Sequence, residues 1–335
     1  MILLPLHSGE RVGVRVLMTF WHHKQVLVTG GAGFIGAHLV WHLADKGARL
    51  TVLDNLQSGR WENLRLDPSH CILADVRDGR AMHDAVRGAR PDVVMHLAAN
   101  ASVPGSVTDP EYDFGSNALG TFNVLEAVRQ ECPAARIVAV SSAAVYGEPT
   151  RFPITEQSEL TPISPYGASK LAAETEARMF HAVYRMPVVI ARLFNTYGPG
   201  MPRFVILDFL RKLQKDPTRL EILGSGKQLR DFNYVSDTVQ GLCLLAEHGV
   251  PGEAYNIASG VSHSITDLAL LLIDTLGLSG KTEFCFTGES WAGDAQRWEV
   301  GIAKAEALGY QPRIQLRAGL ETVIAWFEAQ HGELH

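Results

Sequence analysis

The sequence has few cysteines, and their spacing argues against cross-links and metal sites. Its four cysteines are far apart and form no Cys-x-x-Cys pair; they are Cys71, Cys132, Cys243 and Cys285. This spacing fits reduced thiols in a cytosol better than a disulfide framework, and it excludes a zinc site of the usual pattern. We therefore expect no disulfides and no metal.

Long apolar runs and an excess of positive charge are also missing. No stretch approaches the roughly 18 apolar residues of a membrane span. The apolar start, residues 1–6, is too short for a signal peptide and no small-residue cleavage pattern follows it. The net charge is −6 and the charges are scattered, so no basic stripe is available for a phosphate backbone. We expect a cytoplasmic protein with neither a membrane nor a nucleic acid as partner.

From residue 25 onward, short apolar runs alternate with amphipathic stretches, which is typical of βαβ units in a parallel sheet covered on both faces. The fold class expected is α/β, with a doubly wound parallel sheet. Two helical stretches are long, roughly Glu111–Glu131 and Pro165–Tyr184, and their apolar residues cover either the sheet alone or also a partner subunit. The predicted strands are Gln25–Thr29, Arg49–Leu53, His70–Ala74, Asp92–Leu97, Arg136–Ser141 and Pro187–Leu193.

A glycine-rich segment follows the first predicted strand and opens an amphipathic helix, with the sequence Gly30-Gly31-Ala32-Gly33-Phe34-Ile35-Gly36. Glycines let the backbone approach a pyrophosphate, and the helix N-terminus offers it free N–H groups. Asp54 ends the second strand 21 residues after Gly33, where a carboxylate accepts hydrogen bonds from a ribose and repels a 2′-phosphate. The pattern favours NAD over NADP. The alternatives are an ordinary tight turn and a solvated loop carboxylate.

Two further segments are candidates for the cofactor site of a Rossmann-type domain. Asp75 and Val76 follow the third strand and either frame the adenine or form a simple turn. His96-Leu97-Ala98-Ala99 ends the fourth strand with small residues, which suit a backbone that passes close to a cofactor. We predict the Rossmann-type domain, with the catalytic residues, over residues 24–195. Residues 196–335, where the alternation weakens, are expected to form mainly a smaller α/β lobe that binds the substrate. Residues 1–23 form an extension without assigned function, either disordered or, in part, foreign to the native protein.

The densest chemistry lies between residues 141 and 170. Tyr166 and Lys170 are four residues apart and share one face of a predicted helix, and Ser142 ends a strand. A phenol of pKa near ~10 is a poor base, but the ammonium, the helix N-terminus and a positive nicotinamide stabilise its anion. Tyr166 can then shuttle a proton while Ser142 hydrogen-bonds the same substrate oxygen. In isolation, Tyr-x-x-x-Lys is usually a surface pair.

Together these motifs resemble the extended short-chain dehydrogenases/reductases, specifically the sugar-nucleotide epimerase/dehydratase group, over about residues 25–330. The matching stretches are GGAGFIG (30–36), LDN (53–55), HLAA (96–99), NALGTFNVLEA (117–127), SSAAVYG (141–147), SPYGASK (164–170), RLFNTYGPG (192–200) and RDFNYVSD (230–237). The resemblance implies a homodimer formed through the two long helices and a nucleotide-diphosphate sugar as substrate. It also implies Ser142, Tyr166 and Lys170 as the catalytic set.

The resemblance also assigns binding residues. For the cofactor they are Gly30, Gly33, Phe34, Ile35, Gly36, Asp54, Asn55, Asp75, Val76, Leu97, Ala98, Ala99, Asn117, Tyr166 and Lys170. For the substrate they are Ser102, Ser142, Asn195, Arg230, Asp294 and Trp298, with Asn195 and Arg230 gripping the diphosphate.

Two positions depart from the family pattern. Its Arg-Pro-Gly-Asp element is Trp291-Ala292-Gly293-Asp294 here, which removes an arginine expected to pair with the diphosphate, and Gly301 replaces a usual aspartate. We expect weaker diphosphate binding, unless Arg297 or Lys227 compensates. Trp298 occupies the position at which epimerases carry a residue next to the C2 substituent of the sugar. Its large ring either disfavours an N-acetyl group there or has only a packing role.

The residues after Ser142 bear on the reaction. Family members that eliminate water or carbon dioxide usually carry an acid there, whereas this chain has Ala143 and Ala144. The site therefore resembles that of UDP-glucose 4-epimerases, which oxidise C4 transiently and return the hydride to the other face. The leading hypothesis is such an NAD-dependent 4-epimerase of a nucleotide-linked hexose. The alternatives are a 4,6-dehydratase, a decarboxylase, a 4-keto sugar reductase or epimerase, and a non-catalytic NAD-binding sensor or scaffold.

Overall fold

The computed structural model describes residues 20–332 and 334, apart from 65 and 289–294. Seven parallel strands form the central sheet in the order β10-β6-β5-β4-β1-β2-β3. All six predicted strands are confirmed within two residues at each end, and the Rossmann-type α/β class is confirmed with them. The strands are β1 (Gln25–Thr29), β2 (Arg49–Asp54), β3 (Cys71–Leu73), β4 (Val93–His96), β5 (Arg136–Ser142), β6 (Val188–Leu193) and β10 (Ala254–Ile257).

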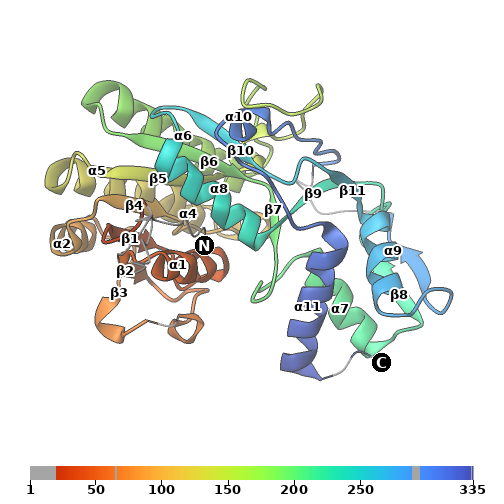
Figure 1. Cartoon of the computed structure of the whole chain (residues 1–335). Coiled ribbons are helices and arrows are strands. Elements are labelled where there is room, and N and C mark those ends of the chain that lie inside the picture. The colour runs from red at the N-terminus through yellow and green to blue at the C-terminus, as the bar shows by residue number, and fades with distance from the viewer. Residues whose placement is uncertain (1–19, 65, 289–294, 333, 335) are drawn as a thin grey trace, which may run out of the picture.

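Helices cover both faces of this sheet (Figure 1). One face packs against α1 (Phe34–Asp45) and α8 (Val235–His248), and the other packs against α2 (Gly79–Ala89), α5 (Gly120–Glu131) and α6 (Pro165–Tyr184). Every residue of β4 and β6 is buried, because a parallel strand covered by helices on both faces has no solvent side. This is why the strands are apolar runs rather than alternating patterns.

The two long helical stretches predicted from the sequence are present. The first is built from α4 (Pro110–Phe114), the π-helical turn η3 (Gly115–Leu119) and α5, which follow one another without leaving helical backbone angles. The second is α6. Shorter elements complete this lobe: α3 (Val103–Thr108), the 3-10 turns η1 (Trp61–Asn63), η2 (Pro68–His70) and η4 (Ala143–Tyr146), and α10 (Ala303–Glu306).

A smaller lobe lies to one side of the sheet, at the right of Figure 1. It has its own apolar core, which includes Leu210, Leu272 and Phe327. Its strands form a three-stranded sheet, β11-β9-β7, and a two-stranded sheet, β12-β8. The elements are β7 (Asn195–Tyr197), α7 (Val205–Lys215), β8 (Arg219–Ile222), β9 (Leu229–Tyr234), β11 (Ser262–Ser264), α9 (Ile265–Thr275), β12 (Glu283–Phe286) and α11 (Leu316–His331).

The chain crosses back from the smaller lobe to the larger one. β10 pairs with β6 at the edge of the central sheet, and α8 packs against α1. The larger lobe therefore includes α8 and β10, which lie after the predicted domain boundary at residue 195. At the other end, Trp21 is 2% exposed and its indole N–H donates to Glu247 of α8, so the ordered core begins inside the predicted extension 1–23. Burial of a large aromatic side chain is favourable enough to order this residue, although it precedes the first strand.

Within the described residues, no helix is long and apolar enough to cross a membrane. The same residues contain no cluster of histidine, cysteine and acidic side chains suited to a metal ion.

Candidate active site

The glycine-rich loop joins β1 to α1 at the carboxyl ends of the strands, next to the end of β4. A Cβ on Gly30 would lie 2.6 Å from the backbone nitrogen of Ala98, and Gly30 has a φ of +71°, so glycine is required there. Gly33 caps α1 with no side-chain hydrogen bond, which leaves the first N–H groups of the helix for another acceptor. This cradle fits the pyrophosphate of a dinucleotide.

Asp54 holds this loop from the end of β2. Its carboxylate accepts hydrogen bonds from the backbone N–H groups of Ala32 (3.0 Å) and Leu56 (2.8 Å), and it is 6% exposed. Burial raises the pKa of Asp54, and the two backbone hydrogen bonds oppose that rise. The side-chain amide of Asn63 binds the carbonyl of Ala32 at 2.8 Å, so the loop is fixed from two sides. The predicted acid thus also shapes the glycine loop.

The other predicted cofactor residues line the neighbouring strand ends. Asp75 follows β3 and accepts hydrogen bonds from Asn55 (2.9 Å) and from the Arg77 guanidinium, which lowers the pKa of Asp75 to about 2. Leu97, Ala98 and Ala99 follow β4.

Asn117 lies in the π-helical turn η3 and is fully buried. Its amide nitrogen donates to Ser169 at 2.9 Å and to Asp113 at 3.1 Å. Its amide oxygen Oδ1 is buried and accepts no hydrogen bond from the described residues. A buried acceptor without a partner is costly, so this oxygen suits a hydroxyl donor on a bound molecule. The observation fits the predicted cofactor role of Asn117.

The three predicted catalytic residues come together where β5 ends and α6 begins. Ser164 caps α6 by accepting from the N–H of Gly167 at 3.1 Å, and this places Tyr166 in the first turn. The Tyr166 hydroxyl hydrogen-bonds the Ser142 side chain. Ser106 of α3 accepts from the Tyr166 backbone N–H at 3.1 Å. The phenol and the serine therefore can share one substrate oxygen, as the sequence predicts.

The electrostatics differ from the prediction. Burial raises the pKa of Tyr166, while the hydrogen bond to Ser142 and the charge of Arg203 lower it. The Lys170 ammonium donates to the carbonyl of Val140 in β5 at 3.0 Å, and burial lowers the pKa of Lys170 to about 8. Desolvation outweighs the charge effects, so the side chains of the protein do not by themselves make the phenol acidic.

The predicted substrate residues lie on the smaller lobe and its junction. Arg230 of β9 is 8% exposed and its guanidinium lies 5.0 Å above the ring of Trp298. Trp298 also packs edge-to-face on Phe194, at 6.0 Å between ring centroids, and its buried indole N–H has no acceptor among the described residues. Asn195 begins β7 directly after Phe194. The Trp298 ring therefore contacts an arginine that is predicted to bind phosphate, and it does not lie in a part of the core away from the predicted substrate residues.

The remaining predicted substrate residues are less informative. Ser102 caps α3 by accepting from the N–H of Gly105 at 3.0 Å, which is a structural contact. Asp294, with the altered element Trp291–Asp294, lies outside the described residues.

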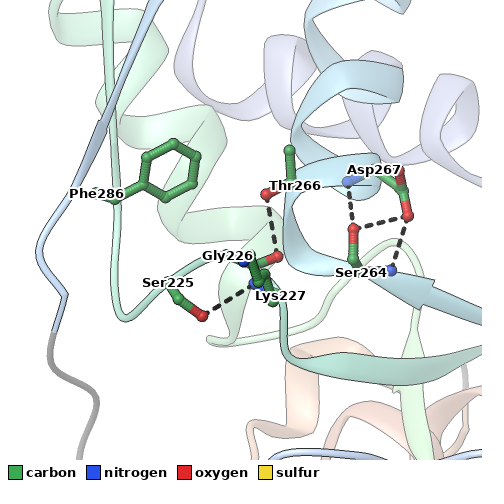
Figure 2. Close-up of a pocket in the computed structure, with 7 residues that line it drawn as sticks. All are labelled: Ser225, Gly226, Lys227, Ser264, Thr266, Asp267 and Phe286. Carbon is green, nitrogen blue, oxygen red and sulfur yellow. Dashed lines mark hydrogen bonds between the residues drawn. The ribbon is translucent and has the colours of Figure 1, made fainter.

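An open pocket of about 760 Å³ lies on the smaller lobe (Figure 2). Its lining combines the loop after β8 with the N-terminus of α9 and Phe286 of β12, and Lys227 is its only residue that the sequence analysis considered for diphosphate binding. The N-terminus of α9 is already capped by Ser264 and Asp267. The lining residues are Ser225, Gly226, Lys227, Ser264, Thr266, Asp267 and Phe286.

Sequence reasoning missed two buried polar groups behind the catalytic residues. Arg192 and Glu174 form a bidentate ion pair, with both side chains at most 1% exposed and N–O distances of 2.9 and 2.7 Å. Asp113 is fully buried beside Ser169. Asp113 and Glu174 lie in polar stretches that give no signal, and only Arg192 interrupts an apolar run, which is too weak to assign a role.

Comparison with known proteins bears on this site. A model of the NAD dependent epimerase/dehydratase family matches residues 26–258. A putative UDP-glucose 4-epimerase of Methanocaldococcus jannaschii is 34% identical, over 90% of this chain and 98% of that protein. UDP-glucuronic acid decarboxylase 1 of Xenopus tropicalis is also 34% identical, over 92% of this chain and 73% of that protein.

A solved structure adds a third reaction. The dTDP-glucose 4,6-dehydratase of Streptomyces venezuelae, with NAD bound, superposes with a TM-score of 0.83 at 31% identity, covering 92% of this chain and 98% of that one. The three similar proteins are thus named for an epimerisation, a decarboxylation and a dehydration. The matched family is NAD dependent and the Streptomyces venezuelae structure contains NAD, so NAD is the cofactor of this protein.

Proposed function

Because the chain belongs to the NAD-dependent epimerase/dehydratase family, we propose that it interconverts the C4 epimers of a nucleotide-linked hexose. The observation that carries the proposal is the environment of Ser142. The 3-10 turn η4 that follows it places Ala143 and Ala144 beside the Ser142–Tyr166 pair, and Ala143 is 1% exposed. The turn supplies no acidic side chain for an elimination.

The next acid along the chain is also engaged elsewhere. Both carboxylate oxygens of Glu148 accept the backbone N–H of Gln296, at 3.0 Å each. Elimination of water or carbon dioxide needs an additional group to manage a proton. An epimerase needs only one proton acceptor, which takes the hydroxyl proton and gives it back. The Ser142–Tyr166 pair meets this simpler requirement.

The chemistry assigned to the side chains follows from their positions. The glycine loop and Asp54 would hold NAD, which when bound would supply the hydride acceptor for C4 and the hydride donor for the return step. Tyr166 takes the proton of the C4 hydroxyl, Ser142 orients that oxygen, and Lys170 holds positive charge beside them. The sugar passes through a 4-ketone, turns over, and regains hydride and proton on the opposite face. The net redox change is zero.

Trp298 supports a hexose as the substrate. Its ring is fixed between Phe194 and Arg230, so a bulky C2 substituent has less space beside it. The same stacking holds the Arg230 guanidinium, which is suited to a diphosphate. We therefore expect UDP-glucose and UDP-galactose to react faster than their N-acetylated counterparts.

Product analysis tests the proposal. The purified protein is incubated without added cofactor with each of these four nucleotide sugars and, separately, with UDP-glucuronate. The products are separated and their masses are measured by mass spectrometry. Epimer of unchanged mass is the expected product. A product lighter by water or by carbon dioxide, the latter from UDP-glucuronate, would instead assign the dehydratase or decarboxylase reaction. No conversion of any nucleotide sugar would refute the proposal.

We also propose a homodimer formed through α5 and α6. Both helices expose large apolar side chains on the surface of the larger lobe: Leu119 at the end of η3, Phe122, Met179 and Val183 are 38–62% exposed. Contact between two such faces would bury this apolar area. Light scattering is expected to give twice the chain mass of 36.6 kDa, and Phe122→Glu with Val183→Glu is expected to give monomers.

A further inference from the structure

Asp113 is a buried carboxylate that none of the predicted motifs includes. It lies in α4, one residue before Phe114 and the π-helical turn η3, and it is 0% exposed. π-Helical turns inside α-helices are frequent at functional sites. A charged side chain is rarely fully buried unless partners compensate its charge.

Three neutral donors hold this carboxylate. Asn100 and Asn117 donate to one oxygen at 2.8 and 3.1 Å, and the Ser169 hydroxyl donates to the other at 2.5 Å. None of the described cations lies within salt-bridge distance of it. Burial raises the pKa of Asp113, whereas the three donated hydrogen bonds and the positive charge of Lys170 oppose that rise and favour the ionised form. The compensating charge must come from a cation farther away.

Ser169 links Asp113 to the catalytic residues. It directly precedes Lys170, and its hydroxyl oxygen, whose single proton is donated to Asp113, lies 3.0 Å from the backbone carbonyl oxygen of Tyr166. The carboxylate thereby fixes the turn of α6 that carries both residues. The negative charge of Asp113 acts on them through space as well, since it raises the pKa of both Tyr166 and Lys170.

The other charged groups around Lys170 and Tyr166 are accounted for. Glu174, one turn farther along α6, is bound to Arg192 at 2.7 Å and approached by Arg178 at 3.2 Å. His96 of β4 is neutral, because burial lowers its pKa to about 3. Arg203 faces Tyr166 from the segment before α7. Asp113 is therefore the acid near Lys170 whose charge no neighbouring arginine neutralises.

We propose that Asp113 is a positioning residue whose buried negative charge keeps the Lys170 ammonium protonated and holds the Ser169 turn of α6 in place. Its effect on turnover rests on the proposed function, whereas its effect on the two side chains does not. Loss of the charge stabilises the Tyr166 phenolate and destabilises the Lys170 ammonium. Both changes lower a pKa, so the pH range in which Tyr166 and Lys170 support turnover moves to lower pH.

Asp113→Asn tests this in the NAD-bound enzyme, because it keeps the size and an acceptor oxygen but removes the charge. Both limbs of the pH–kcat profile should shift to lower pH by about half a unit or more, with a fall of several-fold in kcat on the basic side and little change in KM. The control is Asp109→Asn, the exposed carboxylate that caps the same helix by accepting from Tyr112. It should leave both limbs in place.

A second readout needs no turnover. Near-ultraviolet absorbance is measured as a function of pH for the wild type and for Asp113→Asn, each with and without the additional Tyr166→Phe substitution. Subtracting the curve with Tyr166→Phe from the curve without it gives the absorbance of the Tyr166 phenolate. The phenolate is expected to form at lower pH in Asp113→Asn. Unshifted limbs or an unshifted phenolate titration would overturn the proposal and leave Asp113 with a purely structural role. An inactive wild type would refute the proposed function, while the phenolate titration would still decide the role of Asp113.

Discussion

Gly30→Ala is the sharpest test of the cofactor site, because one methyl group is placed against backbone atoms. The new Cβ would lie 2.6 Å from the nitrogen and 2.8 Å from the Cα of Ala98, and 2.9 Å from the carbonyl carbon of Leu97. These are backbone atoms of the segment that directly follows β4, and they cannot rotate away as a flexible side chain would. Gly30 also has a φ of +71°, which an L-residue adopts only with strain.

The expected cost follows from these two effects. A left-handed backbone costs an L-residue about 1–2 kcal/mol, and insertion of a methyl group into a packed site costs about 1–3 kcal/mol more. If the loop keeps its position, this sum of roughly 2–5 kcal/mol is lost from the free energy of unfolding. If the loop moves away from β4, the same free energy is lost from NAD binding, a weakening of about 30-fold or more.

Calorimetric titration with NAD and thermal unfolding measure the two losses in one preparation. The matched control is Gly88→Ala in α2, where a Cβ meets no atom within 4 Å. Alanine there favours the helix by up to about 1 kcal/mol, so Tm should be unchanged or higher and the Kd for NAD unaltered. A Gly30→Ala protein with the Tm and the NAD affinity of the wild type would refute the argument.

Four further predictions concern the chemistry and the core. Tyr166→Phe should abolish epimer formation while NAD stays bound, as product analysis and the absorbance of bound NAD would show. Trp298→Ala should raise kcat/KM for N-acetylated sugars relative to hexoses by about tenfold or more. Activity should fall as pH rises through about 8, where the buried Lys170 ammonium loses its proton, in a pH–rate profile. Arg192→Met removes the bidentate partner of the buried Glu174, to which Arg178 and Ser141 remain bound, and should cost about 3–5 kcal/mol in urea unfolding.

Each of these has an outcome that contradicts it. Turnover by Tyr166→Phe would remove the phenol from the catalytic set. Unchanged sugar preference in Trp298→Ala would make the indole a packing residue only. A basic limb far above pH 8 would mean that Lys170 is not the group that titrates, and an unchanged stability of Arg192→Met would mean that Glu174 finds another partner.

Much of the fold was predictable because parallel strands leave a local signal. A strand buried on both faces is a short apolar run, and the six runs from Gln25 to Leu193 needed no long-range information. The glycine loop was equally accessible, since its function depends on consecutive residues between one strand and one helix. Tyr166 and Lys170 share a helix face by spacing alone, so their pairing could be predicted as well.

Contacts between distant segments were not predictable in the same way. The pairing of β10 with β6 joins residues more than 60 positions apart, and no local pattern distinguishes such a strand from one in the smaller lobe. Trp21 precedes the first strand and still belongs to the core, because its indole reaches Glu247 on α8. The altered element Trp291–Asp294 departs from the family pattern, and Asp294 lies outside the described residues.

By itself, the amino-acid order determined the strand–helix rhythm, the cofactor loop and the identity of the chemical groups, since each of these depends on neighbours within one or two turns of chain. The tertiary structure decided the charge environment of those groups. Burial raises the pKa of Tyr166, and Asp113 and Ser169, 56 residues apart, meet beside it. Desolvation and electric fields depend on everything that packs around a side chain, so only the folded chain sets them.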